Sequence, residues 1–499
     1  MTDVVLLPYD RLSLDHGAMA DARPESTEIL IIESDTMLRS RTWHAQRLFL
    51  LMSASAHVEN DLRNRGFTVH SITAPTMRAG IEEFREVHPD ASIRCTEPSS
   101  RAVEIALREC AVTLVPDDTF LTSREEFRAW AGDRRPLVME SFYRWQRTRL
   151  GILMEAGSPV GGTWNLDKEN RLPPPKGQHP WPTPLHHEAD EIDQQVWASI
   201  VERDLPVTGS EPHGTWATTR DGALRQLEHF LDTGLAGFGP YEDAMPADSW
   251  SVNHSLLSPY LNLGLITARE VVDAVVRRFE AGGIPLASAE GFIRQVIGWR
   301  EYVNGVYWLF DDEYRDMNAL NAERPLLPLL TDPSRTQMAC ASSVVADVLD
   351  RGWAHHIPRL MILSNLALTS GVRPHEFLGW MKAMFIDAAD WVMVPNVIGM
   401  GLHADGGVMM TKPYASGGAY VKRMGKFCKG CAYDPAKRTG ATACPLTTLY
   451  WDFLDRNRES LRGNHRMAQQ FAGLDRLADL DEVRVRAREV LDGLSAGTI

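Results

Sequence analysis

The spacing of apolar residues changes once along this chain, and that change restricts the folds open to it. In residues 1–135, short runs rich in β-branched residues alternate with helix-like segments, as where EILIIES at 28–34 is followed by a helical pattern at 42–66. Such alternation predicts a parallel α/β sheet with helices on both faces. Beyond about residue 215, apolar residues recur at helical spacing with few strand signals, which predicts an all-helical region.

The chain therefore divides into three regions. Residues 1–135 are predicted to form a Rossmann-like α/β domain, residues 136–214 a helix and an interdomain linker, and residues 215–499 an all-α domain. Proline and glycine are concentrated in the linker between 157 and 185. The first strand is not followed by G-x-G-x-x-G, and G-x-x-x-x-G-K-[ST] does not occur, so the ordinary nucleotide-binding fingerprints are absent.

The N-terminal stretch MTDVVLLPYDR is typical of a first strand rather than of a signal peptide, because it has no basic segment and Pro8 and Asp10 interrupt its apolar run. No apolar stretch reaches the roughly 20 residues that cross a bilayer. We therefore expect a cytoplasmic protein without membrane contact. Thiols stay reduced in that compartment, so clustered cysteines favour metal binding or redox chemistry over disulfides.

A basic stretch stands out against the net charge of −14. Residues 411–431 contain four lysines and one arginine but no acidic residue. Net charge is a weak guide to nucleic-acid binding, because binding depends on a local basic surface. The stretch is either such a surface or a solvated loop. Its basic residues are Lys412, Lys422, Arg423, Lys426 and Lys429.

Three of the six cysteines crowd into FCKGCAYDPAKRTGATACP at 427–445. Cys428, Cys431 and Cys444 supply three ligands, and Cys340 is the predicted fourth, because the remaining two cysteines belong to the α/β region and read as buried hydrophobes. Four thiolates suit either structural zinc or an iron–sulfur cluster. The Cys-Pro pair at 444–445 favours iron–sulfur, and zinc ribbons usually carry two C-x-x-C knuckles rather than one.

Two helical patterns carry polar side chains suited to a nucleotide. SLLSPYLNLG at 255–264 predicts a helix with Ser258 as its N-cap and Pro259 as its first residue. Such an end is either an ordinary cap or a phosphate site. In FIRQVIGWREYVNGVYW, Gln295, Trp299 and Tyr302 share one helical face, which forms either core or the wall of a cofactor site.

The same region offers further candidates. Gly298 allows a planar group to approach closely, and Arg300 is a candidate phosphate partner. His355 and His356 are adjacent, so on a helix they point about 100° apart and cannot serve the same spot. Either one of them donates a proton to a substrate near neutral pH, or both are structural histidines.

Together these segments resemble one family, the iron–sulfur bacterial cryptochromes and (6-4) photolyases, also called photolyase-related proteins. The resemblance covers most of residues 160–460 in order and implies the cryptochrome/photolyase fold. The matching stretches are GGTWNLDKEN, SLLSPYLNLG, FIRQVIGWREYV, AHHIPRLM, WVMVPNVIGM, ADGGVMMTKPYASGGAY and the C-x2-C-x12-C-P run with CPLTTLYWDFLDRNR.

The resemblance implies FAD, folded up in a pocket of the helical domain, with its phosphates at Ser255, Leu256, Leu257 and Ser258. It also implies a [4Fe–4S] cluster on the four cysteines, and a second chromophore, 6,7-dimethyl-8-ribityllumazine, in the α/β domain. The antenna candidates are Asp10 and Glu33, which lie at strand ends. The residues implied around the rest of the flavin are Gln295, Arg300, Arg359, Trp380, Asp387 and Asn396.

The implied activity is light-driven repair of damaged DNA by a monomeric enzyme. The excited reduced flavin would pass an electron to a pyrimidine (6-4) photoproduct flipped from the duplex. His356 matches the family's catalytic histidine, with His355 beside it, and Trp299, Met400 and Tyr414 would line the lesion pocket. The residues implied to hold the DNA phosphates are Lys412, Lys422 and Arg423.

Three positions depart from the family pattern. Met381 stands where a tyrosine is common, and Asp332 stands where relatives carry a tryptophan, so the usual route for electrons from the surface is interrupted. Trp353 and Trp391 are candidate substitutes in that route. Met393 replaces an acidic residue near the reactive nitrogen of the flavin.

Two other functions stay open. A cryptochrome-type blue-light photoreceptor would signal through flavin redox changes, and a zinc-bearing helical scaffold without flavin would follow if each motif were judged alone. Retention of His356, Lys412 and Tyr414 favours repair, because a signalling protein has no need of them.

Overall fold

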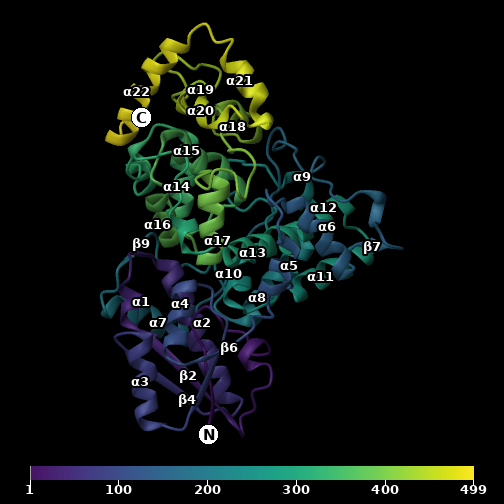
Figure 1. Ribbon diagram of the computed structural model, residues 1–499, viewed down its shortest axis with the longest axis vertical. Helices are drawn as coiled ribbons and strands as arrows, with labels where there is room; N and C mark the ends of the chain where they lie inside the picture. The colour runs from purple at the N-terminus through teal and green to yellow at the C-terminus, as the bar shows by residue number, and fades with distance from the viewer. Residues whose placement is uncertain (1) are drawn as a thin grey trace.

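The structure, a computed structural model that describes residues 2–499, has a parallel sheet at one end and helices over the rest of the molecule (Figure 1). Its five main strands lie in the order β4-β2-β1-β5-β6, and all neighbouring pairs are parallel. The strands are β1 (Asp3–Leu6), β2 (Thr27–Ser34), β4 (Val69–Ala74), β5 (Ser92–Thr96) and β6 (Thr113–Val115). The predicted α/β class is confirmed.

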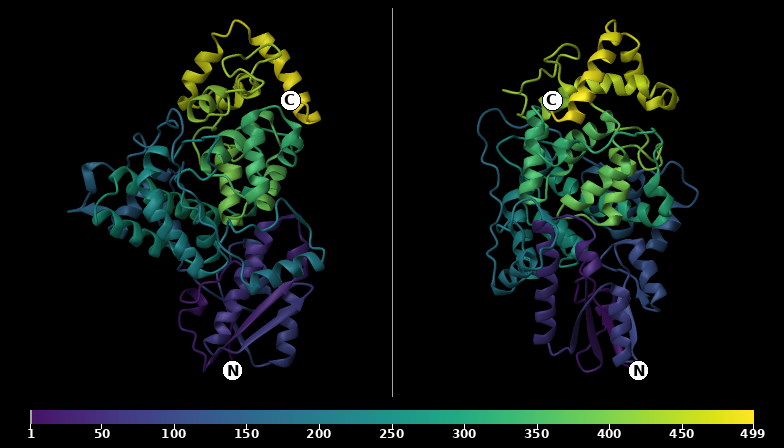
Figure 2. Two further views of the ribbon diagram at one scale, coloured as in Figure 1. Left: turned by 180° about the vertical axis from the view of Figure 1, so that it is seen from behind. Right: turned by 90° about the vertical axis from the view of Figure 1, so that its left-hand side faces the viewer.

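The sheet is buried on both faces, and helices lie on either side of it (Figure 2). Val4 and Leu6 of β1 pack with Phe84 in one cluster, whereas Val5 and Ile29 belong to the core on the opposite face. Successive side chains of a strand point to opposite faces, so a continuous apolar run fills both cores. The covering helices are α2 (Ala45–Asn64), α3 (Met77–Val87) and α4 (Arg101–Glu109).

From residue 215 onward, the described residues form helices joined by loops, and the β-structure there is limited to isolated bridges, which confirms the predicted all-α region. No helix in residues 2–499 is both long enough and apolar enough to span a membrane. The helices used below are α8 (Arg220–His229), α10 (Ser258–Leu263), α12 (Leu286–Ile293), α13 (Glu301–Leu309), α14 (Ala339–Arg351), α16 (Pro374–Met384), α17 (Asp390–Val394), α18 (Gly418–Met424), α19 (Pro445–Arg456) and α22 (Leu480–Ala496).

Packed helices, and not only an extended linker, join the two regions. α5 (Arg124–Ala131) and α6 (Met139–Leu150) pack against the helical region. At this contact Phe127 fits against Gly305 of α13, where a Cβ atom would lie 2.1 Å from the phenyl ring. α7 (Glu191–Glu202) packs instead on α2 of the α/β region.

Besides the five-residue π-helix Phe230–Gly234, three stretches of the helical region are π-helical and seven residues long: Arg294–Arg300, Pro358–Ser364 and Pro395–Gly401. A π-turn holds more residues than an α-turn, so side chains beyond it are rotated relative to an ideal helix. All three stretches contribute to the wall of one cavity. Such segments occur frequently at functional sites, and they direct attention to this cavity.

Candidate active site

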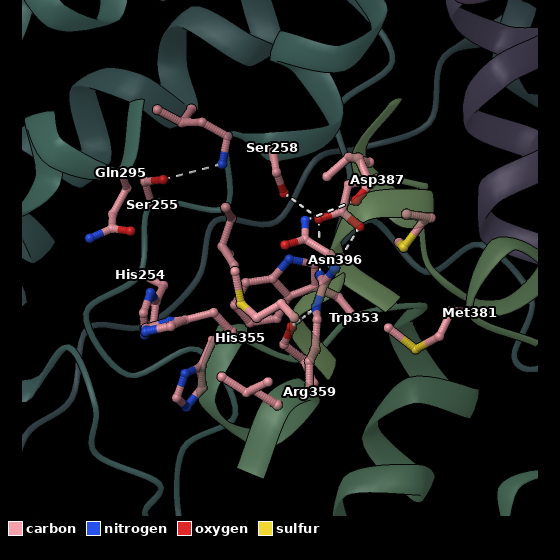
Figure 3. Close-up of a pocket in the computed structure, with 18 of the residues that line it drawn as sticks. His254, Ser255, Ser258, Gln295, Trp353, His355, Arg359, Met381, Asp387 and Asn396 are labelled. Carbon is pink, nitrogen blue, oxygen red and sulfur yellow. Dashed lines mark hydrogen bonds and ion pairs between the residues drawn. The ribbon is translucent and has the colours of Figure 1, made fainter. Parts of the chain in front are cut away.

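A cavity of about 310 Å³ opens within the helical region (Figure 3). Most of its lining is apolar, and a small group of polar side chains lies among it, which is typical of sites for organic cofactors and substrates. The side chains predicted for the flavin or the lesion that lie on its wall are Ser255, Leu256, Leu257, Ser258, Gln295, His355, His356, Arg359, Asp387, Asn396 and Met400.

An ion pair organises the polar part of the wall. Both terminal nitrogens of Arg359 donate to the carboxylate of Asp387 at 2.9 Å, and Ser258 Oγ donates to the same carboxylate at 2.7 Å. The side chains of Arg359 and Asp387 are only 18% and 9% exposed. Charge-assisted hydrogen bonds of this fork geometry are strong and directional, so the patch is preorganised for a polar ligand.

The prediction that Ser258 is a helix N-cap is wrong by one residue. α10 begins at Ser258 with Leu257 in the N-cap position, and Pro259 is the second helical residue. Ser258 Oγ is directed at Asp387 instead of at the backbone of its own helix. The partner comes from far along the chain, so the local sequence could not reveal it.

A buried carboxyl that sequence inspection missed holds Gln295. The side-chain amide of Gln295 donates to Glu242 Oε1 at 2.6 Å, and Asn170 donates to the other oxygen at 3.4 Å. Glu242 is 6% exposed. Burial raises the pKa of Glu242 well above its ordinary value, and the neighbouring carboxylate of Asp243 raises it further.

Replacing Glu242 by glutamine is expected to change the pH dependence of stability. Above the ordinary pKa of 4.5, folded Glu242 retains a proton that the unfolded chain releases. The folded state then binds more protons, so the contribution of Glu242 lowers the free energy of unfolding by about 1.4 kcal/mol for each pH unit. Urea denaturation at about pH 5 and about pH 7 measures this change. As the pH rises between these two values, the free energy of unfolding of the wild-type protein should fall relative to that of Glu242→Gln. An equal pH dependence in the two proteins would contradict the raised pKa of Glu242.

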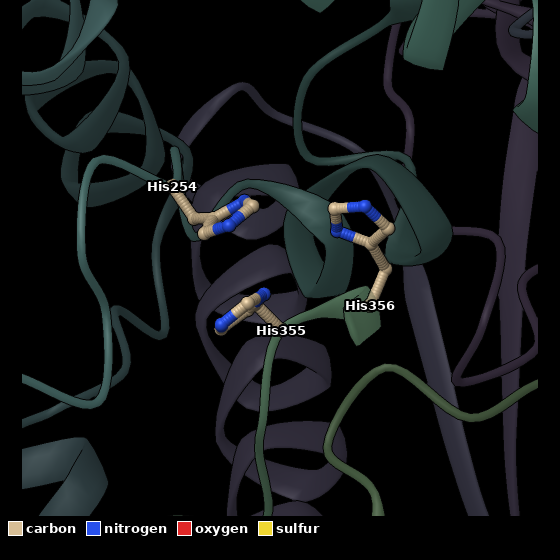
Figure 4. A group of neighbouring side chains, drawn as sticks. All are labelled: His254, His355 and His356. Carbon is tan, nitrogen blue, oxygen red and sulfur yellow. The ribbon is translucent and has the colours of Figure 1, made fainter. Parts of the chain in front are cut away.

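Three histidines meet at one end of the cavity (Figure 4). The rings of His254 and His355 are stacked, with centroids 4.4 Å apart and planes 21° from parallel, and the ring of His356 lies 5.5 Å from that of His254. Burial lowers the pKa of both His254 and His355 well below the ordinary value, so the stacked pair is neutral at physiological pH. The side chain of His356 is 46% exposed and lies 3.6 Å from Asp243.

The two adjacent histidines have different surroundings. His355 precedes its helix, and its Nδ1 accepts a hydrogen bond from the backbone N–H of Ile357 at 3.4 Å. The ring nitrogens of the three histidines lie within 4.8 Å of one another, but the stacked rings direct their lone pairs along nearly parallel planes, which does not suit one shared ion. Sequence inspection missed His254, although it directly precedes Ser255 in a motif already singled out.

Of the three residues predicted to share one helical face, one lies on the wall of this cavity and two do not. Gln295 reaches the cavity, whereas Trp299 and Tyr302 pack with each other, with ring centroids 6.2 Å apart. The segment from Arg294 to Arg300 is π-helical, so its side chains do not follow the α-helical period that the prediction assumed. The planar group beside Gly298 is the ring of Tyr143, which a Cβ at that glycine would approach to 3.2 Å.

Arg300 and Trp380 are engaged elsewhere. Arg300 donates to Glu301 at 3.1 Å, its guanidinium lies 3.8 Å over the ring of Phe120, and its side chain is only 9% exposed. The indole N–H of Trp380 donates to the backbone carbonyl of Leu330 at 2.9 Å. Both side chains are thus engaged by other groups of the protein, and neither residue lies on the cavity wall. The predicted side chains away from the wall are Trp299, Arg300, Trp380 and Tyr414.

The four cysteines proposed as ligands converge. Cys340, Cys428, Cys431 and Cys444 line one small apolar pocket between α14, α18 and α19. Burial and the neighbouring thiols raise the pKa of Cys428 to about 11, so a bound cation would be needed to hold it as thiolate. Among the described residues, no three of these Sγ atoms lie within 4.8 Å of one another. Four thiolates on one zinc ion would stand about 3.8 Å apart, a spacing that these free thiols do not have.

A glycine makes room for one of these ligands. A Cβ atom on Gly418 would lie 2.7 Å from Cys444 Sγ, a distance that forces the sulfur to move. Gly418→Ala is therefore expected to lose bound metal and about 1–3 kcal/mol of stability. The neighbouring Gly417→Ala is a matched control, because its Cβ would lie 3.5 Å from the nearest atom, the Cα of Thr447, which is an ordinary contact. Metal content and urea denaturation distinguish the two, and equal metal content in both variants would contradict the steric argument.

The basic residues do not form one patch with the cavity wall. Lys422 and Arg423 are exposed on α18, and Lys412 lies in the partly exposed segment before it. Lys422, Lys426 and Lys429 line a groove beside the cysteine pocket.

Both antenna candidates are engaged by protein groups. Ser99 Oγ donates to the Asp10 carboxylate, and Arg203 and Tyr9 donate to Glu33 at 2.6 and 3.3 Å. Neither carboxylate lines the cavity described above, so their part in binding a lumazine stays a prediction.

The chain has clear relatives among known proteins. The family model described as Deoxyribodipyrimidine photo-lyase-related protein matches residues 5–216. In structure, a bacterial class III photolyase from Agrobacterium tumefaciens matches with a TM-score of 0.58 and 16% identity over 99% of this chain and 98% of its own. A Synechocystis cryptochrome matches with a TM-score of 0.54 and 14% identity over 85% and 88%. These two likenesses confirm the predicted cryptochrome/photolyase fold.

A (6-4) photolyase from Agrobacterium fabrum is 38% identical over 496 residues, which cover 96% of each chain. Identity at this level along almost the whole of both chains shows that this chain belongs to the (6-4) photolyase family.

Proposed function

We propose that this protein is a (6-4) DNA photolyase, which uses blue light to reverse pyrimidine (6-4) photoproducts in damaged DNA. The observation that carries the proposal is the placement of His356, half-exposed beside a neutral histidine pair, on the wall of the cavity that also holds the Arg359–Asp387 patch. A proton donor open to solvent on the wall of a cofactor-sized cavity suits a substrate that enters from outside. Family membership supports the reaction type.

The residues of the cavity fit FAD. Nε2 of His254 is buried without a hydrogen-bond partner in the protein, and it lines the cavity. A buried polar atom of this kind is satisfied when a ligand supplies the missing group. Ser258, Arg359 and Asn396 offer further hydrogen-bonding groups on the same wall. When bound, FAD supplies the absorption of blue light and the electron for the lesion.

The protein side chains hold the reactants and control one proton. Met381, Met393 and Met400 lie on the wall and keep water from the buried part of the cavity. His356 donates a proton to the flipped lesion from its ring. The stacked His254–His355 pair is uncharged and so does not repel that proton, and Asp243 at 3.6 Å is an ion-pair partner for the protonated ring.

The cysteine pocket is proposed to hold a [4Fe–4S] cluster. Its free thiols are spaced more widely than the ligands of one zinc ion, and the Cys-Pro pair at 444–445 is typical of iron–sulfur ligation. The cluster would join α14 to the C-terminal segment that begins at α18. A lumazine antenna, a cytoplasmic location and a monomeric state stay predictions.

A light-versus-dark repair assay tests the function. Protein reduced chemically beforehand would be mixed with an oligonucleotide that carries one (6-4) photoproduct, and restored thymines would be counted by chromatography. Chemical reduction makes the result independent of how electrons reach the flavin. Restoration in light but not in darkness is expected. If flavin-loaded, reduced protein restores no thymine, the repair proposal fails and the photoreceptor function takes its place.

A further inference from the structure

Two tryptophans in contact connect the cavity with the protein surface. Trp353 is the tryptophan on the cavity wall among the residues described, and it is 5% exposed. Trp250 meets it edge to face, with ring centroids 5.5 Å apart, and is partly exposed to solvent. We propose that Trp353 and Trp250 form the route by which electrons from solution reach FAD in this cavity. The proposal rests on the proposed function only for the place of the flavin.

Indole rings suit this task because they are the side chains most easily oxidised by one electron after thiolates and phenolates. Electron transfer also slows steeply as the gap between donor and acceptor grows, so rings in contact form an efficient pair. Trp353 supplies the inner ring and Trp250 the outer ring. Trp216 also lies near Trp353, with ring centroids 6.5 Å apart. It is only 5% exposed, so a reductant in solution has less access to it than to Trp250.

The family's usual electron route would run through the positions of Trp380, Met381 and Asp332, and these positions do not provide a series of easily oxidised side chains. Trp380 is off the cavity wall, with its indole N–H bound to the carbonyl of Leu330. Met381 occupies the wall there, and a thioether is harder to oxidise than an indole. Asp332, farther out, is an exposed carboxylate that accepts hydrogen bonds from Ser334. Within the part of the chain that the structure describes, Trp380, Met381 and Asp332 therefore do not form a chain of indoles that leads outward.

An arginine lies beside each ring of the proposed route, and each is paired with carboxylates. Arg359 lies 5.8 Å from the Trp353 ring, and its charge is matched by Asp387. The guanidinium of Arg351 lies 4.9 Å from the Trp250 ring and is paired with two carboxylates. These are Asp347 at 2.7 Å and Asp350 at 2.9 Å. The cation beside each ring is thus neutralised by carboxylates, Arg359 by Asp387 and Arg351 by Asp347 and Asp350, so neither cation opposes a positive charge on its ring at full strength.

The electrons balance as follows. Trp353 gives one electron to the photoexcited oxidised flavin and regains one from Trp250. A thiolate in solution reduces the oxidised Trp250 ring and becomes a thiyl radical. Two such passages, with one proton from solvent, deliver the two electrons of the fully reduced flavin anion, and the two thiyl radicals couple to a disulfide.

The test measures photoreduction, separately from repair. Holoprotein with oxidised flavin would be illuminated without oxygen in the presence of dithiothreitol, and the loss of the flavin absorption band followed. Trp250→Phe is expected to slow photoreduction by about tenfold or more, equivalent to roughly 1.4 kcal/mol of added barrier. Trp250→Tyr should restore part of the rate, because a phenol can still be oxidised. Trp353→Phe should be as slow as Trp250→Phe.

Two matched control variants distinguish the proposed route from routes through Trp216 or Trp380. Trp216→Phe removes the other neighbour of Trp353, and Trp380→Phe removes the tryptophan of the alternative side; both should reduce at the wild-type rate. Wild-type speed in Trp250→Phe, or slow reduction in Trp380→Phe alone, would overturn the proposal, as would a wild-type protein that light does not reduce. Trp250→Phe reduced chemically should repair as the wild type does. Loss of repair in every protein would count against the repair function and leave the photoreduction result intact.

Discussion

His356→Ala is expected to abolish most light-driven repair, with a loss of about 10²–10⁴-fold in protein that has been reduced chemically. General acid catalysis by a positioned side chain typically contributes this much, and His356 is the exposed member of the histidine cluster on the cavity wall. Its neighbours do not replace it as proton donors, because His355 is buried, His254 is partly buried, and both are neutral. The oligonucleotide assay measures the loss directly.

Control measurements show whether His356→Ala affects the repair reaction itself or the binding of flavin and DNA. The flavin content of His356→Ala should match that of the wild type, because His356 is half-exposed and the buried polar contacts of the cavity belong to other residues. Binding of lesion-containing DNA, measured by fluorescence anisotropy, should fall far less than repair. His375→Ala, a change of an exposed histidine on α16, should repair normally. Wild-type repair by His356→Ala would show that the proton comes from another group.

The fold class could be predicted from the sequence because each region has one dominant spacing of apolar residues. The run at 28–34 became β2 with both faces buried, and the helical pattern at 42–66 became α2. These spacings are local features of the sequence, and burial of the same apolar residues in the folded protein stabilises the elements that they predict. The four cysteines were also predictable, because only one set of thiols in the helical region could meet.

The details of the cavity were less predictable. The prediction assumed an α-helical period for Gln295 and Trp299, whereas this segment is π-helical, and the local sequence does not indicate a π-turn. The partners of Ser258 and Gln295 are carboxyl groups far along the chain, so their hydrogen bonds depend on tertiary packing. The stack of His254 on His355 joins two distant motifs in the same way.

Loss of one cluster ligand is expected to have the largest effect on stability. Cys340 belongs to α14, while the other three ligands lie far along the chain around α18 and α19, so a cluster on all four closes a long loop. In the chain-entropy account, a cross-link over a loop of roughly 100 residues contributes about 4–5 kcal/mol. Cys340→Ala should lose this contribution together with the bound iron.

Three measurements on Cys340→Ala distinguish a cluster from the alternatives. Elemental analysis of the wild type should give about four iron atoms per chain and little zinc, and the variant should lose most of that iron. The urea midpoint should fall, and limited proteolysis should cut first in the segment from α18 to α22, because the cluster no longer ties it to α14. Cys110→Ala is the matched control: Cys110 is also buried but lies in the α/β region away from the pocket. Wild-type iron content in Cys340→Ala would exclude Cys340 as a ligand, and one zinc per chain in the wild type would show that the wide spacing of the sulfurs closes around a single ion.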